Sequence, residues 1–216
     1  MSKLQVELRM MVDNYWVVVG LKDTTISRLY IPDKVDGYDV RNIASNAFAN
    51  NTNLTYVNMP ETIRYIGEGA FRGCTNLEQV YRHHSHYGTL IVDAMAFYMC
   101  ENLTNIYLNR LIELGHGAFA GCTKLSEFPF DECKDVKAFR KKTFASTRIQ
   151  KVTLHSQRIS KKCFYNTPVD EVFIKGQPTW SEDFFDVLKT AQVFVPPKST
   201  FLDLGFHGIY VEERIK

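Results

Sequence analysis

The sequence predicts a β-rich solenoid of about seven short coils, a fold that convention places in the α/β class. Three observations lead to this prediction. A phenylalanine, preceded in most copies by a small residue, recurs at steps of about 20 to 26 residues, a period typical of stacked repeats. An apolar residue stands five positions before each phenylalanine. Two later apolar residues, separated by two positions, show the period of a β-strand. The aligned aromatic residues are Phe48, Phe71, Phe97, Phe119, Phe144, Phe164 and Phe185.

The copy between Ile66 and Tyr81 shows the repeating unit most clearly. Ile66 lies five positions before Phe71, and the small Ala70 beside Phe71 favours tight packing at a short helical or 3₁₀ turn. Glycines punctuate this turn, and Val80 marks the strand that follows. Each coil is therefore expected to hold a short strand, a turn, an extended return and a compact turn that carries the phenylalanine. Such a coil buries its apolar side only against its neighbours.

These residues resemble a known family. The pattern I-G-x-G-A-F-x-G-C-x-x-L-x-x-V is matched closely by Gly67 to Val80 and nearly as well by Gly115 to Phe128, and it resembles the BspA-like class of leucine-rich repeats. The resemblance extends over roughly residues 26–211. It implies a curved, right-handed solenoid with a parallel sheet on one face, and a protein that binds proteins or surfaces without a catalytic centre. The fifth copy departs from the pattern, since Lys141 to Thr143 replace Gly-x-Ala.

We expect one domain with three parts across its 216 residues. Residues 1–42 are not a repeat, and their alternating and β-rich runs predict an N-terminal β cap. The repeats occupy residues 43–195. Residues 196–216 leave the period and are expected to form a C-terminal cap. Open solenoids need such caps because an end coil would otherwise expose its core and its strand edge.

Composition narrows the classes of function. The formal net charge of +2 is small, so no global field argues for nucleic acid. No apolar run approaches the roughly 20 residues needed to cross a bilayer, so we expect no membrane insertion. No signal-peptide core is seen. The chain is therefore expected in a cytoplasm or in an assembly, or at a cell surface if an export segment was removed; the compartment stays open.

Sequence motifs typical of catalytic, phosphate-binding or metal-binding sites are missing. No phosphate-binding glycine loop, G-x-S-x-G or H-E-x-x-H motif occurs. Three of the five cysteines occupy one repeat position, which predicts a column of buried free thiols: Cys74, Cys100 and Cys122. Paired short spacings typical of a zinc site are missing too. We therefore predict no enzyme activity, no cofactor, no metal and no small-molecule substrate.

The outward residues of the predicted strands are the leading candidates for binding a protein partner. Several are aromatic, and tyrosine and phenylalanine are typical interface anchors; packing between good strand formers is the alternative explanation. The candidates on the strands are Tyr56, Asn58, Tyr81, Asn105, Tyr107, Lys151, Phe173 and Phe194. An insertion after Tyr81 adds loop candidates, which are His83, His84 and His86. The flat sheet would offer on the order of 400 Å², below the roughly 800 Å² per partner of a stable interface, so the loop is needed as well.

A second candidate surface lies in the fifth and sixth copies. Equivalent positions there hold lysines that stacking would place side by side: Lys141, Lys142, Lys161 and Lys162. Such a patch could bind phosphate or an acidic partner, or it could be a solvated edge. Aromatic residues do not interleave with it, which disfavours nucleic acid. A further alternative is a structural or accessory subunit of a larger assembly, including a virus particle.

Overall fold

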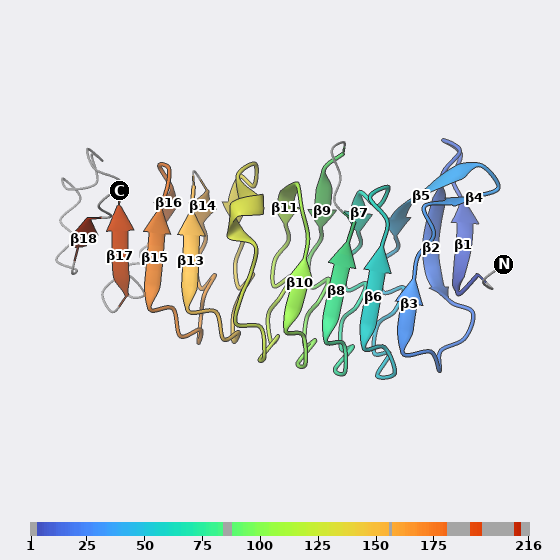
Figure 1. The fold of residues 1–216 in the computed structure, drawn as a ribbon, viewed down its shortest axis with the longest axis horizontal. Coiled ribbons are helices and arrows are strands. Elements are labelled where there is room, and N and C mark those ends of the chain that lie inside the picture. Colours follow the sequence, from blue (N-terminus) through green and yellow to red (C-terminus); the bar gives the residue numbers. More distant parts are fainter. Residues whose placement is uncertain (1–3, 84–87, 156, 181–190, 196–209, 213–216) are drawn as a thin grey trace.

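The computed structural model describes residues 4–83, 88–155, 157–180, 191–195 and 210–212. Its coils follow one another along the long axis in chain order, from β1 at one end to β18 at the other (Figure 1). Parallel strands run across both sides of this stack, and the described residues contain a single short 3₁₀ helix. The predicted β-rich solenoid is therefore confirmed.

Five strands precede the first aligned phenylalanine. They are β1 (Val6–Met10), β2 (Trp16–Leu21), β3 (Arg28–Tyr30), β4 (Lys34–Val35) and β5 (Tyr38–Ile43). The hairpin β1–β2 is antiparallel, whereas β2 pairs with β5 in parallel and so joins the hairpin to the repeats. The division into residues 1–42, 43–195 and 196–216 stays a prediction, because residues 196–209 and 213–216 lie outside the described part of the chain.

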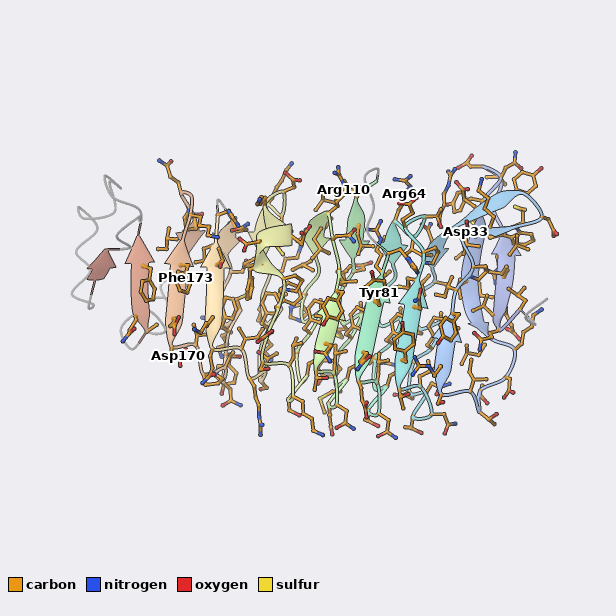
Figure 2. All side chains as sticks on the ribbon, in the orientation of Figure 1. Asp33, Arg64, Tyr81, Arg110, Asp170 and Phe173 are labelled. Atoms are coloured by element: carbon orange, nitrogen blue, oxygen red, sulfur yellow. The ribbon has the colours of Figure 1, made fainter. Side chains whose placement is uncertain are left out.

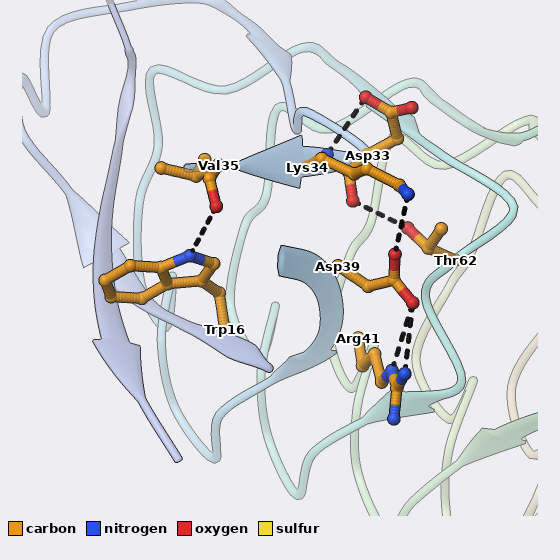
Figure 3. Close-up of polar contacts among 7 residues, drawn as sticks. All are labelled: Trp16, Asp33, Lys34, Val35, Asp39, Arg41 and Thr62. Atoms are coloured by element: carbon orange, nitrogen blue, oxygen red, sulfur yellow. Dashed lines mark hydrogen bonds and ion pairs between the residues drawn. The ribbon is translucent and has the colours of Figure 1, made fainter. Parts of the chain in front are cut away.

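Polar contacts hold the hairpin β4–β5 at the upper edge of this end (Figure 3). Trp16 Nε1 donates a hydrogen bond of 2.9 Å to the carbonyl of Val35. The Asp39 carboxylate lies 3.1 Å from Arg41 and 3.6 Å from Lys34. Exposed ion pairs of this kind contribute little to the free energy of unfolding, about 0 to 1 kcal/mol each. The part-buried hydrogen bond of Trp16 is therefore expected to stabilise the hairpin more than these ion pairs do.

The front of the solenoid, called the strand face here, consists of two parallel four-stranded sheets. The first contains β3, β6 (Tyr56–Met59), β8 (Gln79–Arg82) and β10 (Asn105–Tyr107). The second contains β13 (Lys151–Leu154), β15 (Glu171–Ile174), β17 (Gln192–Val195) and β18 (Tyr210–Glu212). In β6, β8, β13 and β15, buried residues alternate with more exposed ones, as the period of two predicts.

Coil four, the coil that contains Phe119, has no strand on this face. Its chain passes through Pro129, with φ −76° and ψ 67°, into the 3₁₀ helix η1 (Phe130–Cys133). Proline has no backbone N–H to donate to a ladder, so it is excluded from the middle of a sheet. The predicted row of strands is therefore divided between β10 and β13.

The back of the solenoid carries a second set of parallel strands. Beyond β5 they are β7 (Tyr65–Ile66), β9 (Leu90–Val92), β11 (Leu111–Leu114), β12 (Ala138–Phe139), β14 (Arg158–Ile159) and β16 (Thr179–Trp180). Each ends on the apolar residue five positions before an aligned phenylalanine. The sequence prediction placed a sheet on one face only. Only one position of each back strand recurs along the chain, the apolar residue five positions before the phenylalanine, so the repeat pattern showed no alternation from which these strands could be predicted.

The segment around each aligned phenylalanine from Phe48 to Phe164, called the Phe turn here, is a hydrogen-bonded turn in place of the short helical or 3₁₀ turn expected. Backbone hydrogen bonds join successive Phe turns: the N–H of Phe71 donates to Ala96 and that of Phe97 to Ala118, at 2.7 and 2.8 Å. Gly69 and Gly73 on either side of Phe71 have φ of +59° and +71°. Glycine adopts this left-handed conformation without a steric penalty.

The phenylalanine rings stack through the middle of the solenoid. Neighbouring centroids from Phe48 to Phe119 are 4.9, 5.1 and 5.3 Å apart, and the series continues to Phe144 at 5.9 Å and Phe164 at 5.3 Å. None of these six side chains is more than 3% exposed. Phe185 lies outside the described residues. The apolar side of each coil is thus buried by its neighbours, as the repeat pattern predicts.

The predicted column of buried free thiols is confirmed, since all five cysteines are free and buried. Cys74, Cys100 and Cys122 each donate to the carbonyl of the phenylalanine one coil earlier, over 3.1 Å. Burial raises the pKa of Cys74 to about 12 and raises those of Cys100 and Cys122 as well. These thiols are therefore unreactive packing groups.

Phe119→Ala should lower the free energy of unfolding by about 3–5 kcal/mol, because it leaves a cavity in the middle of the ring stack. Equilibrium urea unfolding would measure this loss. The matched control is Tyr107→Ala, which removes an aromatic ring that is 57% exposed. A loss of similar size in both variants would contradict the central place of the ring stack.

Ellman's reagent at pH 8 should label no cysteine of the folded chain and all five after denaturation. The pKa of Cys74 rises from its ordinary 9.0 to about 12 on folding, so its stabilising contribution is complete below pH 9 and is lost as the pH rises toward 12. The free energy of unfolding should therefore fall above pH 9, by about 1.4 kcal/mol per pH unit for each such thiol. Cys122→Ala should make this decline shallower; an unchanged slope, or labelling of the folded chain, would refute the buried column.

Candidate functional site

The register of the first front sheet aligns the outward side chains of its four strands, β3, β6, β8 and β10. Tyr30 pairs with Asn58, Asn58 with Tyr81 and Tyr81 with Tyr107. Tyr30, Tyr81 and Tyr107 are 50%, 37% and 57% exposed. A second row beside the first contains Arg28, Tyr56, Gln79 and Asn105. The tyrosine patch is defined as Arg28, Tyr30, Tyr56, Asn58, Tyr81, His83 and Tyr107.

Side chains of the tyrosine patch contact one another across strands. The rings of Tyr30 and Tyr56 lie 5.7 Å apart, and those of Tyr81 and Tyr107 lie 5.9 Å apart. Asn58 Nδ2 donates to the Tyr56 hydroxyl over 3.2 Å. The patch is therefore a connected surface, with its rings held in place before any partner arrives.

Two cationic or titratable groups border these rings. The Arg28 guanidinium lies 4.2 Å from the centre of the Tyr56 ring, and its Nε donates to the Tyr30 hydroxyl over 3.1 Å. That hydrogen bond raises the pKa of Arg28. At the other edge, His83 Nε2 lies 2.9 Å from Asn58 Oδ1, and the His83 ring meets Tyr81 edge-on at 5.4 Å. His84 and His86 lie outside the described residues.

The remaining predicted residues of the strand face lie beyond coil four. Phe173 and Phe194 are in register on β15 and β17, where their rings stack at 4.4 Å. Lys151 forms an ion pair of 3.0 Å with Glu171. Figure 2 shows Tyr81 and Phe173 on the same face of the molecule, in different sheets. The structure thus brings Tyr56, Asn58, Tyr81, Tyr107 and His83 together, with Asn105 at their edge, and places Lys151, Phe173 and Phe194 in a separate group.

Two residues of the tyrosine patch were missed by the sequence analysis, namely Arg28 and Tyr30. A signal was present: Leu29-Tyr30-Ile31-Pro32 repeats the order of Val57-Asn58-Met59-Pro60. β3 is accordingly one more strand of the front sheet, although no aligned phenylalanine precedes it.

A buried arginine supports the upper edge of the patch. Arg82 occupies an inward strand position and is 1% exposed. It donates to the carbonyls of Glu61, Ile63 and Asn109 at 2.9, 3.1 and 3.2 Å, and also to Asn109 Oδ1. Burial lowers the pKa of Arg82 to about 10. Asn109 Nδ2 in turn donates to the carbonyl of His83 over 3.2 Å, so this network positions His83 beside the tyrosines.

The missing strand of coil four leaves two hollows in the strand face. One, of about 180 Å³, lies between β10 and the segment 127–129. The other, of about 430 Å³, lies between the segment 126–131 and β13. Glu127, Phe128 and Pro129 line both hollows and form the ridge between them.

The four predicted lysines lie elsewhere on the molecule. Lys141, Lys142, Lys161 and Lys162, called the lysine patch here, are exposed in the Phe turns that follow β12 and β14 of the back sheet. Among the described residues none of them forms an ion pair, although nearby Arg140 lies 2.6 Å from Glu113. Lys162 Nζ lies 5.4 Å from the centre of the Tyr165 ring. The lysine patch and the tyrosine patch are therefore separate candidate surfaces.

Two other kinds of site are missing from the part of the chain that the structure describes. No group of three or more His, Cys, Asp or Glu side chains there is arranged to hold a metal ion. None of its helices has the length and apolar character needed to span a bilayer.

Comparison with known proteins bears on the fold. Two similar solved structures are a leucine-rich cell-surface protein from Faecalibacterium prausnitzii A2-165 and a leucine-rich-repeat protein from T. pallidum. The first has a TM-score of 0.70 at 22% identity over 90% of this chain, which spans 54% of that protein. The second has a TM-score of 0.69 at 21% identity, and the match covers 95% of each chain. At these identities both similarities show the fold alone.

Comparison with curated protein sequences finds no match. A family model described as the BspA-type leucine-rich-repeat region matches residues 41–170 in 6 copies. This stretch contains the aligned phenylalanines from Phe48 to Phe164 and the column of buried thiols. The chain belongs to the BspA-type leucine-rich-repeat family.

Proposed function

We propose that the chain is a non-enzymatic interaction module whose tyrosine patch binds a protein partner. The observation that carries this proposal is the alignment of exposed tyrosines from successive coils, Tyr30, Tyr81 and Tyr107, by the register of one parallel sheet. Tyrosine supplies a large contact area and a polar hydroxyl, and it is enriched at the centres of protein interfaces. Contiguous apolar surface of this kind often marks an interaction site.

The size of the patch limits the partner's contact. Four strands at a spacing of about 4.8 Å span about 14 Å, which is well below the width of a stable interface. A firm complex would therefore extend beyond the patch, across coil four toward Phe173 and Phe194 or onto the loop that follows His83. The similar F. prausnitzii protein is described as a cell-surface protein, and a binding role at a surface is a proposal for this chain.

Tyr81→Ala combined with Tyr107→Ala should abolish partner capture and leave the unfolding curve close to that of the unchanged protein, because both rings are partly exposed and lie outside the core. Proteins retained from the native source by immobilised wild-type and variant chains would be compared by mass spectrometry. The matched control is Tyr98→Ala with Tyr165→Ala. These rings are 38% and 58% exposed, against 37% and 57% for the test pair, and they lie in the Phe turns. Retention of the same proteins by both variants would overturn the proposal.

The lysine patch supports a second, anion-binding candidate, because its four exposed ammonium groups form no ion pair within the described residues. Lys141→Ala with Lys161→Ala should elute from immobilised heparin at lower salt than the wild type, since fewer counterions are released on binding. Lys22→Ala with Lys124→Ala removes the same charge from exposed positions elsewhere. Equal elution of the two variants, or retention that salt does not weaken, would count against this candidate.

A further inference from the structure

The smaller hollow of coil four has the walls of a side-chain pocket. Its floor is apolar, since Ile106 is 5% and Phe128 is 9% exposed. Tyr107, which is 57% exposed, forms one wall, and Glu127 and Pro129 form the other. An aromatic ring, an apolar floor and a carboxylate therefore meet in about 180 Å³.

Glu127 carries an uncompensated charge beside this hollow. Neighbouring cations on the strand face already have partners: Lys151 lies 3.0 Å from Glu171, and Lys175 lies 3.1 Å from Asp131. Glu127 is exposed, and no described residue forms an ion pair with it. The hollow thus presents a negative charge for which the described part of the chain supplies no counterion.

The other end of the tyrosine patch shows how this face holds a cation. There the Arg28 guanidinium lies 4.2 Å from the centre of the Tyr56 ring and donates to the Tyr30 hydroxyl. Asn105 and Glu127 follow Tyr56 in the same row of outward positions, and Tyr107 follows Tyr30 in the other. Tyr56 supplies a ring to Arg28, and Tyr30 supplies an oxygen acceptor. Tyr107 and Glu127 offer the same two kinds of group, and no described cation forms an ion pair with Glu127.

We propose that this hollow receives an arginine side chain of the protein partner; this inference rests on the proposed function of the strand face. The planar guanidinium stacks on the Tyr107 ring and donates two hydrogen bonds to the Glu127 carboxylate. The aliphatic stem covers Ile106 and Phe128. Lysine fits less well, because a compact ammonium cannot form the bidentate contact and stack at once. The partner is thus a protein that presents an exposed arginine at its contact surface.

The probe for this site is N-acetyl-arginine methylamide, titrated into the full-length ¹⁵N-labelled chain. Its matched control is N-acetyl-citrulline methylamide, which has nearly the same shape without the charge. The arginine probe should bind saturably, and the perturbed amide signals should belong to residues 105–107, 127–128 and 130–131. The citrulline probe should bind about three- to fivefold more weakly, the ratio expected of an exposed ion pair.

Glu127→Gln should weaken the arginine probe by about the same three- to fivefold factor and leave the citrulline probe unchanged. Glu78→Gln is the control, because Glu78 is also an exposed carboxylate of the front face and does not line the hollow. Equal binding of the two probes, signals elsewhere, no saturation, or equal effects of the two substitutions would each overturn the arginine site. Partner capture that still depends on Tyr81 and Tyr107 would then leave the proposed function standing, so the two failures are distinguishable.

Discussion

No coil of this protein can bury its apolar side alone, and the rest of the structure follows from that constraint. Each coil supplies one phenylalanine, and the rings from Phe48 to Phe164 form a continuous buried stack. Backbone hydrogen bonds between successive Phe turns hold the coils in register along that stack. Because the register is set inside, the outward side chains of the strands are also aligned, and equivalent residues of successive coils become neighbours. A surface patch therefore arises as a by-product of core packing.

One proline changes what that surface offers. Pro129 occupies an outward position of coil four, where a parallel ladder would need a backbone N–H. The chain turns into η1 there, and the strand face separates into a part with tyrosines and a part with stacked phenylalanines. The hollows beside Glu127–Pro129 have the same cause, since no strand fills the space between β10 and β13. A regular repeat would present a flat sheet, whereas this break leaves hollows that can accommodate a partner's side chain.

The two charged surfaces differ in a way that bears on partner choice. The lysine patch lies in the Phe turns that follow β12 and β14, and its charges are free of ion pairs within the described residues. The strand face instead presents tyrosines, amides, the Arg28 guanidinium and the carboxylate of Glu127, while Lys151 and Lys175 are already paired. A partner that reaches the hollow beside Glu127 is accordingly expected to bring its own positive charge there. Complementary charge favours correct encounter more than it adds affinity.

The repeat pattern alone determined the solenoid, the inward phenylalanines and the buried column of Cys74, Cys100 and Cys122, because each depends on a residue type that recurs at a fixed position. It also placed Tyr56, Asn58, Tyr81 and Tyr107 outward, since a strand alternates its side chains between two faces. Only the tertiary structure decided which of these residues share a surface. The back strands share only one recurring apolar position, so they show no alternation in the sequence. Pro129 interrupts hydrogen bonding between neighbouring coils, which a single coil does not show. Arg28, Tyr30 and Arg82 acquire their roles from contacts between coils. Such contacts depend on how coils stack in space, which the order of residues within one repeat does not contain.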